Sequence, residues 1–284
     1  MSAVTVGVIL LVLGNLSASL SDVAVKLLHG GISPYQYIFV RQLLSVALIT
    51  PIWLHQSKQQ RTLTAPYLTA TRSLLIIIGS GCLMVAITHL PLATANAIIY
   101  AAPLIMLPLS VWLLKEVPPI GKVIGTVIGF CGVLIVLRPS HFHWAALFAL
   151  GTATTLALFN ILARKIPQQQ PVVTTLFWTS LLSIPVSGVL AYWHWQPINL
   201  EQIALVAASA LLILLYNGCA VKAYKKAPAG QIALAEYSGL IFVGLFGVWW
   251  FDEIPDWLTA IGIALIIMPL LPIKSLFHRG IKSK

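Results

Sequence analysis

The sequence predicts an all-α membrane protein with ten transmembrane helices arranged as two inverted-topology five-helix repeats. Three observations lead to this prediction. The chain is 59% hydrophobic and only 8% charged, whereas soluble domains are usually about 25% charged. Apolar runs of about 20 residues, enough to cross a hydrocarbon core of about 30 Å, recur from end to end. The sequence also matches itself at an offset of 137 residues.

The apolar runs define ten spans joined by short connections, so little chain remains for a soluble domain. The N-terminus has no basic segment or cleavage site typical of a secretory signal, and we expect the first run to remain as a span. The predicted spans cover residues 4–28, 35–54, 66–89, 92–114, 120–137, 144–165, 171–192, 200–224, 229–251 and 256–273.

The basic residues indicate orientation rather than a nucleic-acid partner. Alternate loops and the tail contain thirteen Lys and Arg residues, and the opposite loops contain Arg138 alone. Because cytoplasmic loops are enriched in Lys and Arg, we expect both termini in the cytoplasm and the protein in the cell inner membrane. Contact with the lipid bilayer then accounts for the net charge of +10. The thirteen residues are Lys58, Arg61, Lys115, Lys122, Arg164, Lys165, Lys222, Lys225, Lys226, Lys274, Arg279, Lys282 and Lys284.

The internal repeat divides the chain into 1–138, 139–274 and a basic cytoplasmic tail, 275–284. Each copy has five spans, and because five is odd the second copy must enter the membrane from the opposite face. Inverted repeats are a common framework for alternating access, with substrate bound near the midplane. The matched positions are Pro34 and Pro171, Cys82 and Cys219, Pro91 and Pro228, Tyr100 and Tyr237, Trp112 and Trp249, Glu116 and Glu253, Pro118 and Pro255, and Gly125 and Gly262.

Two segments, "ATANAIIYAAPLIMLPLSVWLLKEVPPIGKVIG" and "QIALAEYSGLIFVGLFGVWWFDEIPDWLTAIGIALI", resemble EamA-type repeats of the drug/metabolite transporter superfamily. The shared pattern is an Arg in the second span, a Pro before the fourth, and a Glu before a Gly-spaced fifth. The second copy departs from it, with Trp178 where the first has Arg41. The resemblance implies a transporter of small metabolites, and "ALAEYSGLIF" is similar to carriers of S-adenosylmethionine and riboflavin.

When the charged residues assigned to loops and span ends are set aside, five charged side chains remain inside the predicted spans: Asp22, Lys26, Arg41, Arg72 and Glu236. A charge at a helix centre costs at least about 2.5 kcal/mol, so such residues usually face a partner or a wet cavity. Helical rise places Asp22 and Arg41 about 9 to 10 Å from one end of their spans, and Arg72 and Glu236 similarly from the other. Two pairs are therefore expected on either side of the midplane.

Alternatives stay open for these charges. Glu236 is interpreted as a proton-coupling group, as a ligand for a cationic substrate, or as a fixed partner of Arg72. The planar donor fork of Arg41 suits a substrate carboxylate, and a permanent pair with Asp22 is the alternative. In the first span, polar residues from Asn15 to Lys26 follow one helix face, which indicates either a cavity lining or hydrogen bonds between helices.

The candidate residues fall into three groups. The expected substrate-binding or coupling residues are Asp22, Lys26, Arg41, Asn96, Tyr100, Glu236 and Tyr237. A second tier comprises Asn15, Tyr37, Arg72, Trp178, Tyr216 and Asn217. Pro103 and Pro108 are candidate hinge residues within the fourth span, because proline removes backbone hydrogen bonds.

These observations favour a secondary active transporter that moves a small polar organic metabolite by alternating access. The expected substrate is amino-acid-like, S-adenosylmethionine-like or riboflavin-like, and a proton is the candidate coupling ion. No catalytic residue, cofactor, metal or nucleic-acid partner is expected, and the protein is a monomer or a homodimer. The alternative is a membrane enzyme or flippase that acts on a lipid-linked substrate.

Overall fold

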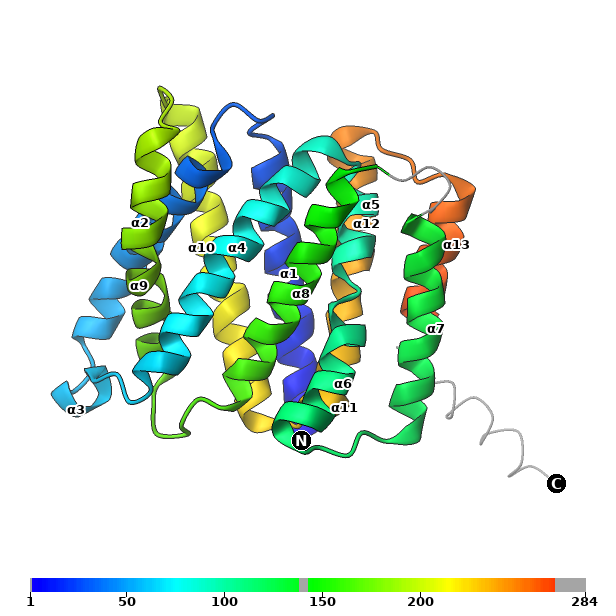
Figure 1. Cartoon of the computed structure of the whole chain (residues 1–284), viewed down its shortest axis with the longest axis horizontal. Coiled ribbons are helices and arrows are strands. Elements are labelled where there is room, and N and C mark those ends of the chain that lie inside the picture. Colours follow the sequence, from blue (N-terminus) through cyan, green and yellow to red (C-terminus); the bar gives the residue numbers. More distant parts are fainter. Residues whose placement is uncertain (1, 138–142, 269–284) are drawn as a thin grey trace.

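The computed structural model describes residues 2–137 and 143–268, and all regular structure in these ranges is helical (Figure 1). The helices are α1 (Ala3–Lys26), α2 (Pro34–Leu54), α3 (Lys58–Arg61), α4 (Pro66–His89), α5 (Leu92–Ile99), α6 (Ala102–Leu114), α7 (Ile120–Leu137), α8 (Ala145–Arg164), α9 (Val172–Trp193), α10 (Leu200–Lys226), α11 (Ala229–Ile232), the 3₁₀ helix η2 (Ala233–Tyr237), α12 (Ser238–Phe251) and α13 (Trp257–Ile267).

The all-helical membrane class is confirmed, whereas the count of ten spans stays a prediction. Within the described residues, eight stretches of helix are long and apolar enough to cross a membrane. Two shorter apolar helices, Val123–Ile135 and Trp257–Ile266, correspond to the fifth and tenth predicted spans. The predicted end of the tenth span, and the tail 275–284, lie outside the described residues.

Local sequence signals explain where several helices begin. Ser33 accepts a hydrogen bond from the backbone of Gln36 at 3.2 Å, and Pro34 occupies the first turn of α2, where its missing N–H has no cost. Asn199 and Gln202 form a reciprocal capping box at the start of α10. These caps supply partners for N–H groups that a membrane helix leaves unsatisfied at its ends.

The fourth span of each half is interrupted. In the first half α5 ends at Ile99 and α6 begins at Ala102, so the predicted continuous span 92–114 consists of two helices. Pro103 consequently lies in the first turn of α6, where proline is tolerated, whereas Pro108 lies inside that helix. In the second half, η2 separates α11 from α12. Both breaks fall at the repeat-related tyrosines, Tyr100 and Tyr237.

The helices of one half pack mainly against those of the other (Figure 1). α1 packs against α10, α4 against α8, α2 against α9, and α7 against α13. The offset of 137 residues exchanges α1 with α8 and α4 with α10, so each of these packing pairs maps onto another or onto itself. On α8 the alanines at 145, 149, 153 and 157 are fully buried, and small residues at this spacing allow close helix contact.

Candidate substrate cavity

A cavity of about 130 Å³ lies between the two halves, beside both interrupted spans. Its polar lining comes from α1, α2, α4, α5, α8, α10 and η2, and from Tyr100 at the first break. The polar lining residues are Asn15, Asp22, Arg41, Ser80, Asn96, Tyr100, Thr152, Thr155, Tyr216, Asn217 and Glu236. Five of the seven first-tier candidates and three of the six second-tier candidates therefore converge on one space.

Glu236 lies in η2 and is only 2% exposed. Its Oε1 accepts hydrogen bonds from the Tyr224 hydroxyl at 2.7 Å and from the Asn160 amide at 3.2 Å. Arg72 instead donates to the carbonyl of Phe159 and lies 3.6 Å above the Phe159 ring. Among the described residues, the hydrogen bonds of Glu236 thus come from neutral groups, and those of Arg72 go elsewhere.

Asn15 connects α1 to the break in the second half. Its Nδ2 lies 3.1 Å from the carbonyl of Ala235, 3.2 Å from that of Glu236 and 3.1 Å from the hydroxyl of Ser238. Ser19, one turn later, donates to the carbonyl of Gly239 at 3.2 Å. A helix break leaves backbone carbonyls without their usual partners. The polar face of α1 supplies those partners and thereby positions Glu236.

Arg41 is 3% exposed, and its donor fork is incompletely used. Nη1 donates to the Tyr37 hydroxyl at 3.3 Å and Nη2 donates to Ser80, while Nε has no hydrogen-bond partner among residues 2–137 and 143–268. Asp22 is also buried and lines the same cavity as this guanidinium and the Asn96 amide. A buried basic side chain and a buried acidic side chain therefore face one cavity, and the hydrogen bonds of Arg41 go to neutral hydroxyl groups.

The other candidates lie outside this cavity lining. Lys26 pairs with Glu253 at the end of α1. Tyr237 is buried close to Gly129 of α7, and its hydroxyl has no hydrogen-bond partner in the part of the chain that the structure describes. Trp178 donates to the carbonyl of Arg61 at 3.0 Å, within an aromatic cluster near α3. Tyr37 contributes indirectly, by holding Arg41.

Two partners of Glu236 were missed by the sequence analysis. Asn160 is a lone amide in the apolar run "LALFNILA", which is a usable signal in a membrane helix. Tyr224 follows Lys222 near the end of α10 and is indistinguishable by sequence from the tyrosines common at membrane interfaces. Ser80, Thr152 and Thr155 also line the cavity, but serine and threonine are too common in membrane helices to stand out.

Comparison with known proteins agrees with this architecture. The EamA-like transporter family matches residues 5–138 and 143–272. The chain is 26% identical over 268 residues to the S-adenosylmethionine uptake transporter of Rickettsia prowazekii (strain Madrid E), an alignment that covers 93% of this chain and 90% of that protein. It is 23% identical over 266 residues to the pseudopaline exporter CntI of Pseudomonas aeruginosa (strain UCBPP-PA14), covering 92% and 93%.

A solved crystal structure shares the fold with a TM-score of 0.69 and 17% identity, and the match covers 99% of each chain. The family match spans nearly the whole sequence in two segments, each about the length of the internal repeat. It favours transport over the alternative of a membrane enzyme or flippase. The chain therefore belongs to the EamA-like transporter family and is a multi-pass membrane transporter of small metabolites rather than an enzyme.

Proposed function

We propose that the protein is a secondary active transporter that moves a zwitterionic or cationic organic metabolite by alternating access. The observation that carries this proposal is the convergence of Asp22, Arg41 and Glu236, from both halves of the chain, on one cavity. Buried charges of both signs suit a substrate that itself carries both. The substrate gradient or a coupled ion supplies the driving force.

The proposed architecture is ten transmembrane helices in two inverted repeats, 1–138 and 139–274, with both termini in the cytoplasm of a bacterial-type inner membrane. The exchange of packing pairs by the repeat offset supports it. Further support comes from Lys115 and Asp252, which are repeat mates and both end their helices with positive φ, at 55° and 51°. The functional unit is a monomer or a homodimer.

Arg41 is the proposed ligand for a substrate carboxylate, because its free Nε and neighbouring nitrogen form part of a planar fork. Asp22 and Glu236 are the proposed ligands for an ammonium or sulfonium group. Asn96, Tyr100, Tyr216 and Asn217 complete the lining with hydrogen-bonding and aromatic surface. S-adenosylmethionine carries all three charged groups and is transported by similar proteins.

The cavity of about 130 Å³ is smaller than the roughly 300–1,000 Å³ of typical ligand pockets. Loading a substrate the size of S-adenosylmethionine therefore requires the halves to separate. Such a separation is the movement that alternating access provides.

Glu236 is also the candidate site for a coupling proton. Its partners, Tyr224 and Asn160, are neutral, so the carboxylate is able to exchange a proton or a cationic substrate group without first leaving an ion pair. Lys26 and Tyr237 lie outside the cavity lining and are not assigned to substrate binding.

Uptake by the purified chain in liposomes tests the proposal, with labelled S-adenosylmethionine, riboflavin and amino acids, each with and without a pH gradient. Saturable uptake of at least one charged probe is expected. Arg41→Lys is expected to reduce uptake of a carboxylate-bearing probe at least about tenfold, because Lys offers a point charge rather than a fork. Absence of uptake of all probes under both conditions would contradict the proposed substrate class.

Proton coupling is tested by Glu236→Gln, with the exposed Glu201→Gln as the matched control. The variant is expected to lose the stimulation of uptake by a pH gradient, whereas the control keeps it. Stimulation that persists in Glu236→Gln would assign coupling to another group.

A further inference from the structure

Glu253, which follows α12 in the second half, contacts a side chain and a backbone N–H of the first half. It follows Asp252, the left-handed residue that ends α12. One carboxylate oxygen, Oε1, pairs with Lys26 at the last turn of α1. The other, Oε2, accepts a hydrogen bond from the backbone N–H of Leu92, at the start of α5, at 2.7 Å. Lys26 also donates to the carbonyl of Leu90 at 3.3 Å. We call these contacts of Glu253, Lys26 and Leu92 the Glu253 lock.

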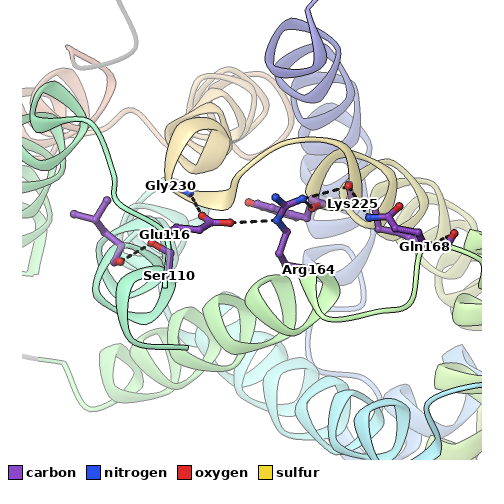
Figure 2. Close-up of polar contacts among 8 residues, drawn as sticks. Ser110, Glu116, Arg164, Gln168, Lys225 and Gly230 are labelled. Atoms are coloured by element: carbon purple, nitrogen blue, oxygen red, sulfur yellow. Dashed lines mark hydrogen bonds and ion pairs between the residues drawn. The ribbon is translucent and has the colours of Figure 1, made fainter. Parts of the chain in front are cut away.

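Glu116 forms the same arrangement at its own end (Figure 2). It follows Lys115, the left-handed residue that ends α6. Its Oε1 accepts from the Arg164 side chain at 3.2 Å, and its Oε2 accepts from the backbone N–H of Gly230 at 3.2 Å. Arg164 also donates to the carbonyl of Lys225 at 3.3 Å. We call the contacts of Glu116, Arg164 and Gly230 the Glu116 lock.

The two locks share one plan, with partners that differ by one position in the repeat: the mates of Lys26 and Leu92 are Ala163 and Ala229, the neighbours of Arg164 and Gly230. In each, a glutamate from one half binds a basic residue at the end of the first long helix of the other half. In each, it also binds an N–H in the first turn of the other half's fourth span, where a helix N-terminus favours an anion. The backbone N–H of each glutamate closes the same turn, onto Ser110 at 3.1 Å for Glu116 and onto Gly247 at 3.0 Å for Glu253.

The locks lie at opposite ends of the bundle. Figure 1 places α11, beside the Glu116 lock, at the lower end, and α5, beside the Glu253 lock, toward the upper end. All four charged side chains are mostly shielded, with exposed fractions of 14% and 24% for Lys26 and Glu253 and of 27% and 15% for Arg164 and Glu116. Pairs shielded in this way are less weakened by solvent than surface pairs.

A second cavity, of about 460 Å³, adjoins the Glu253 lock. Glu253, Pro91 and His143 are among the residues that line it, and the lining does not include Asp22 or Glu236. The lock therefore borders one space while the charges of the substrate cavity border another.

We propose that the two locks are opposed gates, such that the substrate cavity opens at one end only when the lock at that end is broken. This inference rests on the alternating access proposed above. Both glutamates hold groups of the opposite half, so separation of the halves at either end must pull the carboxylate from its partners. Because both ends carry the same kind of contact between the halves, either end can be held closed while the other opens.

A single cysteine in the substrate cavity reports on both gates. Ala18 lines the cavity and is partly exposed, so Ala18→Cys is introduced into the full chain after Cys82, Cys131 and Cys219 are changed to serine. A membrane-impermeant thiol reagent is applied separately to right-side-out and inside-out membrane vesicles. The measured quantity is the ratio of the labelling rates from the two faces.

Glu253→Gln is expected to raise labelling from its own end at least about fivefold relative to the other end, and Glu116→Gln to shift the ratio in the opposite direction. Gln keeps the shape and one acceptor oxygen but loses the charge, and a fivefold ratio is the scale of one weakened partly buried contact. Lys26→Gln removes the partner of Glu253 and should shift the labelling ratio as Glu253→Gln does, and Arg164→Gln should likewise act as Glu116→Gln does. With two variants for each lock, the test still stands if one of them fails to fold.

Matched controls distinguish the locks from general loss of charge. Glu201→Gln removes an exposed carboxylate from the first turn of α10, and Lys165→Gln removes the exposed charge next to Arg164. Neither should change the ratio. If the cysteine is labelled from both faces and the ratio of labelling rates is the same in all lock variants, the gate proposal is wrong and alternating access still holds. If the cysteine is labelled from the same single face in every variant, both alternating access and the gate proposal are wrong.

Discussion

The ends of the two halves are alike, whereas their middles differ. At the ends, the repeat mates Glu116 and Glu253 each bind a basic side chain and a backbone N–H of the other half. At the broken fourth spans, the position of Glu236 is occupied in the first half by its repeat mate Ile99, and Arg41 is matched by Trp178. A symmetric scaffold can reverse its movement, but a single asymmetric substrate needs only one set of ligands. In the proposed mechanism, the duplication therefore persists at the two locks and is lost at the substrate cavity.

The two tyrosines at the breaks show the same divergence. Tyr100 lines the cavity and lies close to Gly239. Its mate Tyr237 packs toward Gly129 on α7 instead. The difference follows from a small residue: Gly239 leaves room for the Tyr100 ring, whereas the mate of Gly239 is Ala102.

The largest loss of uptake is expected when Glu236, at the break in the second half, is replaced by isoleucine, the residue type of its repeat mate Ile99. Glu236→Ile should abolish uptake of a charged probe, with a loss of at least about 100-fold. It should also lower the free energy of unfolding by about 1–3 kcal/mol, because Tyr224 and Asn160 lose their acceptor. Uptake in liposomes and thermal unfolding in detergent measure the two effects. Glu236→Gln, which keeps an acceptor, should retain the stability, and equal destabilisation by both variants would contradict this account.

A smaller effect is expected from Gly239→Ala. The added methyl group would collide with the Tyr100 hydroxyl, and forced overpacking typically costs about 1–3 kcal/mol. We expect about a tenfold loss of uptake, partly restored in the double variant with Tyr100→Phe. Gly244→Ala on the same helix is the control, since no atom lies within 4 Å of a Cβ there. Equal losses in the two alanine variants would show that helix stiffness, rather than Tyr100, is responsible.

Replacing Asn15 should lower the free energy of unfolding more than replacing its repeat mate Thr152. Asn15→Ala removes contacts to three groups around the second break and should lower the free energy of unfolding by about 1–2 kcal/mol. Thr152→Ala removes one interhelical contact, to the carbonyl of Gly79 at 3.3 Å, and should cost less than about 1 kcal/mol. Thermal unfolding of the two variants side by side measures the difference, and a reversed order would refute the role of Asn15 at the break.

The smallest effect is expected at Trp178. Because its indole bonds the carbonyl of Arg61 and packs beside Trp53, away from the cavity lining, Trp178→Phe should leave the KM for uptake within about twofold. Arg41→Lys at the mate position should raise it at least about tenfold. Uptake measured against substrate concentration in the two variants provides the test. A large change of KM in Trp178→Phe would mean that Trp178 contributes to substrate binding.

The charged part of the cavity lining was predictable because buried charge is rare in a membrane protein. Asp22, Arg41 and Glu236 stand out in apolar runs, and the cost of burial implies a common wet space. Lys26 stood out for the same reason but lies at a helix end, where it meets Glu253. Span ends are the least certain feature of a sequence-based assignment, and a shift of one turn moves a side chain from a cavity to a gate.

The sequence by itself determined the membrane class and the few charged residues inside the bundle, because composition and periodicity express the cost of placing a chain in lipid. The resemblance of its motifs indicated the family, which the family match confirms. Only the tertiary structure decided which neutral groups hold those charges, that Asn15 holds a break more than 200 residues away, and that the two glutamates bind opposite halves. These contacts depend on the rotation and crossing of packed helices. Hydrophobic periodicity leaves both open when nearly every face of a helix is apolar.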